Sequence, residues 1–213
     1  MKTTFLFLIL GLTAYGQMYQ RTGKNIGLTL GAQYSFLQND QSVTGLGGSV
    51  GLIHMMKPGI YLKSGYSYSK NNQSEYFRPE LAAPAVHQSV DASILIDKRI
   101  LKLSHGRPIA SAYGCHYFSI GLIAAPEYHY DIYARSTNNA TPHEISGLIG
   151  FSFCHIYKSK GRQNMSKTTQ FDLFYRQGFT PYYTNALTGQ EFKRAELGLQ
   201  IRRIRHQVSN VLR

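Results

Sequence analysis

The sequence lacks the long apolar segments that membrane-spanning helices require. Beyond its first 16 residues, no run approaches the roughly 18 consecutive apolar residues that mark such a helix. Tryptophan is absent, only two cysteines occur, and charged residues make up 16% of the 213 residues, against about 25% in typical soluble domains. These scarcities exclude a helical membrane protein and disfavour an ordinary soluble domain.

The chain contains instead a regular alternation of apolar and small polar side chains. The segment NIGLTLGAQYSF, residues 25–36, places apolar residues at even positions and glycine or polar residues at most odd positions. Because side chains alternate between the two faces of a strand, this segment is predicted to form a strand with one apolar face and one small polar face. With 16 tyrosines, 11 phenylalanines and 20 glycines, the chain has material for more such strands.

The same alternation recurs at residues 46–55, 60–69, 90–97, 118–131, 144–154, 170–176 and 194–202. These lengths approach the roughly 9–11 residues that a tilted strand needs to cross a bilayer. Tyrosines gather at one end of the apolar faces, as at a membrane interface, namely Tyr34, Tyr66, Tyr68, Tyr128, Tyr130 and Tyr175. We therefore predict an all-β protein, an eight-stranded antiparallel transmembrane β-barrel with up-and-down topology. A secreted soluble sandwich or lipocalin-like barrel is the alternative.

The N-terminus has the features of a secretory signal peptide. Lys2 precedes a short apolar run at residues 5–12, and Ala14, Tyr15 and Gly16 form the small-x-small pattern of a cleavage site. We predict a signal peptide at residues 1–16 and one barrel domain at residues 17–213, which ends in a short basic tail. An uncleaved anchor helix is the alternative, disfavoured because the run is shorter than the roughly 20 residues that span a bilayer.

A resemblance to a known group supports this interpretation. The segments FSIGLIAAPEYHY, TTQFDLFYRQGFTPYY and AELGLQI, the strand rhythm, and the leader that ends before Gln17 resemble the PorT-like small outer-membrane β-barrel proteins of Gram-negative bacteria. The resemblance implies a β-barrel in the outer membrane and no particular activity. With both termini periplasmic, we expect outer loops at residues 37–43, 70–87, 132–143 and 180–191, and inner turns at residues 57–59, 98–116 and 157–167. We also expect a bulge or kink at Pro126, which lies mid-strand.

Several charged residues share parity with the small residues and are predicted to face the lumen. An eight-stranded barrel is just wide enough for side chains to fill it, so we expect these charges to pair with one another. The predicted network consists of Lys63, Asp91, Glu127, Asp172, Arg176, Glu196 and Arg202. A narrow pore or ligand pocket is the alternative.

The segment EYHYD places Glu127, His129 and Asp131 on one face near the outer rim. Carboxylate and imidazole at this spacing could perform acid–base chemistry or hold a metal, although hydrogen bonding at the rim is the simpler interpretation. The sequence has no phosphate-binding loop, zinc spacing or Gly-x-Ser-x-Gly motif. We therefore expect no enzyme activity, no metal and no cofactor.

Two cysteines, Cys115 and Cys154, share the inward parity near the inner ends of adjacent antiparallel strands. Facing residues on such strands have a Cβ separation that suits a disulfide, and export permits one. A bridge between them is one prediction, and two free thiols are the alternative.

Basic residues concentrate in the predicted inner turns and the C-terminal tail, whereas acidic residues lie in strands or outer loops. We predict a basic periplasmic face that includes Lys98, Arg99, Lys102, Arg107, Lys158, Lys160, Arg162, Lys167, Arg203 and Arg205. Such a face would meet lipid phosphates, an acidic periplasmic protein domain or the anionic cell wall, and nucleic acid is not an expected partner. The function expected from this is a structural or adapter role in an envelope assembly. The alternatives are transport or binding of a small solute or lipid and, less favoured, a lipid-modifying membrane enzyme.

Overall fold

The computed structural model describes residues 25–38, 40–72, 86–103, 109–110, 114–132, 141–159, 165–185 and 188–207, so the predicted signal peptide lies outside the described residues. Eight long strands form the fold: β1 (Ile26–Leu37), β2 (Asp40–Lys57), β3 (Ile60–Asn71), β4 (Val86–Lys102), β6 (Gly114–Asp131), β7 (His143–Ser159), β8 (Met165–Gly178) and β11 (Arg194–Gln207). Three short strands accompany them: β5 (Ile109–Ala110), β9 (Tyr183–Thr184) and β10 (Glu191–Phe192). Within these ranges, no helix has the length and apolar character needed to cross a membrane.

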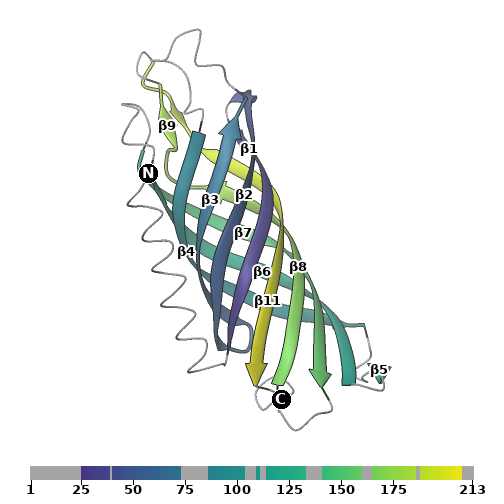
Figure 1. Cartoon of the computed structure of the whole chain (residues 1–213). Coiled ribbons are helices and arrows are strands. Elements are labelled where there is room, and N and C mark those ends of the chain that lie inside the picture. Colours follow the sequence, from purple (N-terminus) through teal and green to yellow (C-terminus); the bar gives the residue numbers. More distant parts are fainter. Residues whose placement is uncertain are drawn as a thin grey trace.

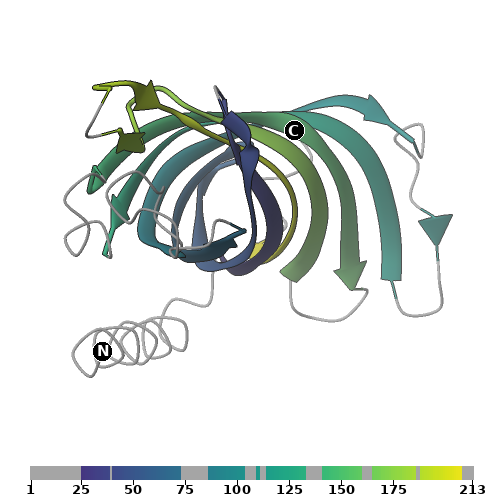
Figure 2. The same ribbon diagram turned by 90° about the horizontal axis from the view of Figure 1, so that it is seen from above.

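The eight long strands close into a barrel. Each pairs antiparallel with its neighbours, β4 pairs with β6, and β1 pairs with β11 along its whole length. The strands are steeply inclined to the barrel axis (Figure 1) and curve around a lumen when seen from above (Figure 2). The predicted eight-stranded antiparallel barrel is confirmed, and closure gives both edges of every long strand a partner.

The two ends of the barrel differ and are named here for what lies at each. The terminal rim is the end where β1 begins at Ile26 and β11 ends at Gln207. The hairpin rim is the opposite end, where β9 and β10 pair with each other (Figure 1). Strands β4, β6 and β7, with 17 or 18 residues each, are longer than the 12 residues of β1.

Apolar side chains cover the outside of the barrel, and mostly small or polar ones face the lumen. In β1, Leu28 and Leu30 are 55% and 60% exposed, whereas Thr29 between them is 2% exposed. The same alternation places Leu197 and Leu199 of β11 outside. An apolar exterior around a polar interior inverts the distribution of a soluble domain and is that of a β-barrel in lipid.

The structure corrects several predicted connections. The β1–β2 connection is a short turn rather than a loop at residues 37–43, because β2 begins at Asp40. Much of the inner turns predicted at residues 98–116 and 157–167 is strand, since β4 continues to Lys102 and β7 to Ser159. The tight turn at residues 57–59 is present, and Gly59 takes a φ of +82°, a conformation that favours glycine.

Pro126 does not produce the predicted bulge. The register between β6 and β4 is the same on both sides of it, with Glu127 opposite Ser93 and Ala124 opposite Ile96. The register shift of this ladder lies between Arg99 and Leu101, but the ladder is interrupted at Pro126, because Ile94 and Leu95 do not pair with Pro126 and Ala125. Proline has no N–H to donate to a ladder. In the ladder between β6 and β7, Pro126 lies opposite Gly147 and the register is unbroken.

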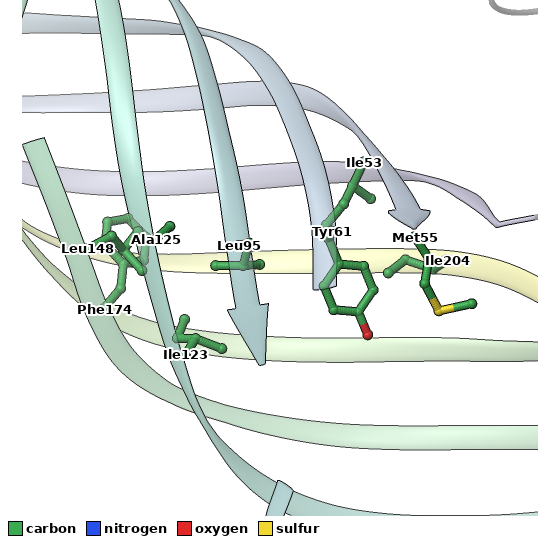
Figure 3. Packing of buried hydrophobic residues seen from close by; sticks show 9 residues of the cluster. All are labelled: Ile53, Met55, Tyr61, Leu95, Ile123, Ala125, Leu148, Phe174 and Ile204. Carbon is green, nitrogen blue, oxygen red and sulfur yellow. The ribbon is translucent and has the colours of Figure 1, made fainter. Parts of the chain in front are cut away.

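An apolar cluster fills part of the lumen (Figure 3). It consists of Ile53, Met55, Tyr61, Leu95, Ile123, Ala125, Leu148, Phe174 and Ile204, all at most 6% exposed. The ring of Phe174 lies against Gly198 of the next strand, so closely that a side chain at position 198 would collide with it. The lumen is therefore filled by protein in this region.

A second apolar cluster lies at the hairpin rim. The β9–β10 hairpin brings Tyr182, Tyr183 and Phe192 against Leu37 and Val43, and all five side chains are buried. Tyr182 is 1% exposed, and its backbone N–H donates to the carbonyl oxygen of Phe192 at 2.9 Å. The predicted outer loop at residues 180–191 is thus a folded cap rather than a free segment, in the part of it that the structure describes.

Candidate functional site

The seven charged residues predicted to face the lumen all do so. They lie at positions of inward parity on β3, β4, β6, β8 and β11, and the most exposed of them, Asp91, is only 8% exposed. Burying a charge is costly unless it is paired, so the geometry of their contacts decides what the network does. The structure divides six of them between two clusters along the barrel axis, whereas Asp91 contacts His129.

The first cluster, nearer the terminal rim, is centred on Arg202, which is 0% exposed. Its Nε donates to Asp172 Oδ2 at 2.5 Å, and its Nη2 donates to Asp97 Oδ2 at 3.1 Å. Gln200 extends the cluster by accepting a hydrogen bond from Lys63 Nζ at 2.7 Å and donating to Asp172 at 3.0 Å. The guanidinium of Arg202 also lies over the ring of Tyr61, 5.3 Å from its centroid.

The second cluster, nearer the hairpin rim, is centred on Arg176 and Arg194. Arg176 donates to both Glu127 and Glu196, which the sequence predicted as lumen residues. Arg194 contacts Glu196 at 3.5 Å and Glu144 at 2.9 Å. Together the five residues form a continuous buried chain of alternating charge.

The predicted network lacked three charged members of these clusters, Asp97, Glu144 and Arg194. Asp97 has the same parity as Asp91 and ends the alternating segment 90–97, so the pattern placed it on the inward face although the predicted network did not include it. Glu144 and Arg194 lie at strand ends beside predicted loops, where parity gives little guidance. Asp97 is the second carboxylate that Arg202 contacts, besides Asp172. Glu144 is the second carboxylate that Arg194 contacts, besides Glu196.

The buried charges of the described lumen are weighted towards acids. Seven carboxylates are buried: Asp91, Asp97, Glu127, Asp131, Glu144, Asp172 and Glu196. The buried bases are Lys63, Arg176, Arg194 and Arg202, with Arg99 half-buried beside Asp97. Two buried histidines contact two of these acids, His87 with Asp131 at 2.6 Å and His129 with Asp91 at 2.7 Å.

His129 takes part in an arrangement that the sequence did not reveal. Its Nδ1 lies 2.7 Å from Asp91 Oδ1, and its Nε2 lies 2.8 Å from Ser146 Oγ. Glu127, predicted to act with it, is more distant at 3.9 Å. Ser146 lies on the neighbouring strand at inward parity, which is the one signal that could have identified it.

An aligned serine, histidine and aspartate have the contacts of a hydrolytic triad. Ser146 is 0% exposed and His129 is 1% exposed, so a substrate cannot approach the hydroxyl without rearrangement of the barrel. Asp91 also accepts hydrogen bonds from Ser67 and from Ser89, the latter at 2.5 Å. In the described part of the chain, no group of three or more histidine, cysteine or acidic residues has the arrangement of a metal site.

Tyr182 closes the polar lumen at the hairpin rim. Its ring packs edge-on against His87 with centroids 5.4 Å apart, and the guanidinium of Arg194 lies 5.2 Å from its centroid. Burial raises the pKa of Tyr182 well above its ordinary value, although Arg194 opposes that rise. The phenol therefore stays neutral at physiological pH and acts as an uncharged cover over the buried charges.

The predicted disulfide between Cys115 and Cys154 is wrong, because both thiols are free. In the β6–β7 ladder Cys115 lies opposite Lys158, and Cys154 lies opposite Ser119. The pairing is thus displaced by four residues from the predicted one, which corresponds to about 13 Å along a strand. A disulfide requires Cα atoms within about 7 Å.

The ten residues predicted to form one basic periplasmic face do not lie together on such a face in the part of the chain that the structure describes. Arg107, Lys160 and Arg162 lie outside the described residues, and the other seven lie in strands rather than turns. Arg99 does not belong to this face, because it bonds Asp97 in the lumen at 2.6 Å. Lys102 and Lys158 take positions of inward parity at the lumen mouth, opposite Ser119 and Cys115.

The remaining cations of this set face outward. They are Lys98, Lys167, Arg203 and Arg205, and all four are exposed. The basic residues near the terminal rim therefore form two groups. We call Lys102 and Lys158 the mouth cations, and Lys167, Arg203 and Arg205, which are adjacent on β8 and β11, the wall cations.

Comparisons with known proteins add little to this geometry. No protein-family model and no curated protein matches the chain. Among solved structures, Neisserial surface protein A (NspA) is similar with a TM-score of 0.35 and 13% identity, over 83% of this chain and 94% of that one. The N-terminal β-barrel domain of Pseudomonas aeruginosa OprF is similar with a TM-score of 0.29 and 11% identity, over 84% of this chain and 98% of that one. Values this low carry no argument about function.

Proposed function

We propose that this chain is a small outer-membrane β-barrel of a Gram-negative envelope, with a structural or adapter role and with both termini in the periplasm. The observation that carries the proposal is the inverted surface of the barrel. Side chains such as Leu30 and Leu199 are 60% and 62% exposed, whereas the polar residues beside them, Thr29 and Gln200, are 2% and 3% exposed. The PorT-like resemblance of the sequence supports the same location.

The filled lumen favours a structural role over transport. The apolar cluster, the two ion-pair clusters and the hairpin cap together occupy the interior with side chains. The enclosed Ser146 and His129 favour a structural role over catalysis, since their hydrogen bonds join β6 to β7 inside the barrel. We therefore propose that the protein is not an enzyme.

The adapter role would use the mouth cations. Lys102 is exposed and Lys158 half-buried at the terminal rim, where the proposed topology points them towards the periplasm. Two lysines on this rim, separated by β6 and by four residues along β7, suit an extended acidic surface such as a periplasmic protein domain or the anionic cell wall. Such contacts weaken as ionic strength rises. Nucleic acid is not a proposed partner.

Two measurements test the proposal. Envelope fractionation should place the protein in the outer membrane, and the folded band should resist SDS until heated. Envelope proteins or cell-wall fragments that co-purify in mild detergent at low salt should be lost from the K102Q/K158Q variant but retained by K70Q/K193Q. Lys70 and Lys193 lie near the hairpin rim, so this control removes the same charge elsewhere. Recovery in the soluble periplasm would refute the location, and identical co-purification by both variants would refute the adapter role.

A further inference from the structure

Towards the terminal rim, the outward side chains of four neighbouring strands change from apolar to basic and aromatic. On β11, β8, β7 and β6 the outward residues in register are first apolar, namely Ile201, Phe171, Phe153 and Ile120. The next outward row towards the terminal rim is Arg203, Thr169, His155 and Phe118, and the row after it is Arg205, Lys167, Tyr157 and His116. Two rows that contain basic and aromatic side chains thus lie between the apolar outer surface and the terminal rim.

The wall cations lie within reach of a single anionic group. Arg205 is directly opposite Lys167 on the neighbouring strand, and Arg203 is two residues away on the same face. Guanidinium groups bind phosphate oxygens through paired hydrogen bonds, and the lysine adds a compact positive charge.

The exposed carboxylate that the structure describes lies far from the wall cations. Of the carboxylates whose side chains the structure describes, Glu191 alone is exposed, and it lies in the hairpin at the other end of the barrel. The others are buried in the lumen, on the opposite side of the barrel wall. The wall cations thus lie outside the barrel at one end of its apolar band, where the headgroups of anionic lipids occur.

Stacked rings form a fixed surface beside the wall cations. His116 Nδ1 lies 2.9 Å from His155 Nε2 with the two rings stacked, and Phe118 stacks on His155 at 4.8 Å between centroids. Tyr157 packs against His116 at 5.0 Å and is opposite Lys167 in the β7–β8 ladder. Aromatic residues of this kind settle at the level of lipid headgroups, where one part of the ring is apolar and another is hydrated.

We propose that Lys167, Arg203 and Arg205, beside His155 and Tyr157, form a binding site for the phosphate of an anionic glycerophospholipid. The phosphate lies against the three cations, while the acyl chains lie along Ile201 and Phe171 above them. The choice of glycerophospholipid rests on the topology proposed above, in which the terminal rim faces the periplasm and this wall meets the inner leaflet. The site is distinct from the mouth cations, which have the opposite parity.

Native mass spectrometry of the full chain in mild detergent tests the site. We expect the wild type to retain phosphatidylglycerol, and the K167Q/R203Q variant to retain roughly tenfold less, because each basic residue near the membrane surface contributes to anion binding. The matched control is K70Q/K193Q, which removes two cations near the hairpin rim and should bind as the wild type does. Phosphatidylethanolamine, lipid A and inorganic phosphate are the comparison ligands.

Each outcome decides the proposal. Equal retention of phosphatidylglycerol and phosphatidylethanolamine, or equal retention by K167Q/R203Q and the wild type, would overturn it. Preference for lipid A would overturn the assigned leaflet, and binding of inorganic phosphate without the lipid would overturn the lipid as ligand. Heat-modifiable migration of each variant shows that the barrel is folded. The K102Q/K158Q variant should keep its lipid, so failure of the adapter role and failure of this site are distinguishable.

Discussion

Arg202 and Arg203 are consecutive residues of β11 in opposite surroundings. Arg202 is 0% exposed and holds Asp172 and Asp97 inside the lumen. Arg203 is exposed on the outer wall, beyond the apolar row that includes Ile201. The two-residue period of a strand therefore gives the same side chain two different tasks, internal pairing on one face and contact with the surroundings on the other.

Removal of Arg202 should have the largest effect. The R202A substitution leaves Asp172 in the lumen without its guanidinium partner and Asp97 with Arg99 alone. Loss of one member of a buried pair typically costs about 3–5 kcal/mol. We expect the free energy of unfolding to fall by that amount, measured by urea titration of the barrel in detergent micelles or bilayers. The control is R203A on the outer wall, and a loss below about 1 kcal/mol for R202A would contradict the lumen network.

A charge placed on the apolar wall should have the next largest effect. Leu199 is 62% exposed on the outer face of β11, and an arginine there would lie in hydrocarbon. Substitution of this kind near the bilayer midplane costs about 2–4 kcal/mol in transmembrane barrels. L199R should unfold at lower denaturant than the wild type in lipid bilayers, whereas L199M should not, and equal stability of the three would show that this face is not in lipid.

Loss of the Ser146 hydroxyl should have an intermediate effect. The S146A substitution removes the hydrogen-bond partner of His129 Nε2 at 2.8 Å, and a buried polar group left unpaired costs about 1–3 kcal/mol. The exposed Ser64 of β3 provides the control S64A, which should change stability by less than about 0.5 kcal/mol. If S146A is as stable as S64A, the hydrogen bond between Ser146 and His129 contributes nothing to the stability of the fold.

Neutralisation of Arg203 should have the smallest effect on stability. R203Q changes an exposed side chain at the edge of the apolar band, and surface substitutions away from buried features usually stay within about 0.5 kcal/mol. The same urea titration that detects R202A should leave R203Q unchanged. A cost close to that of R202A would mean that Arg203 is part of the structural network rather than of the outer wall.

The alternation of the sequence was sufficient to predict the barrel and the inward side of the seven charges assigned to the lumen. It is a local property, because one strand of period two determines its own inward and outward sets. Asp91, Glu127 and Arg176 were placed in the lumen from this pattern alone, and the structure places them there.

Properties that depend on two strands together could not be predicted in the same way. The disulfide prediction failed because it assumed the register of β6 against β7, and the actual register differs by four residues while parity is preserved. The alternation also does not show which lumen side chains pair with each other. An example is the hydrogen bond from Lys63 to Gln200 across the barrel interior. The lengths of β4 and β7 were also not predicted, because both strands continue through basic residues beyond their apolar runs.

The seam between β1 and β11 has a consequence for the order of folding. Ile26 lies opposite Arg205, and Leu37 lies opposite Arg194, so the first strand of the barrel completes its hydrogen bonding only with the last. Until β11 is available, β1 has an open edge, which hydrocarbon does not tolerate. Contacts between such distant parts of a chain form slowly because the loop-closure entropy must be lost first. Closure of this seam is therefore expected to be the late and rate-limiting event, and a chain truncated before β11 should persist as an unclosed sheet that requires a chaperone.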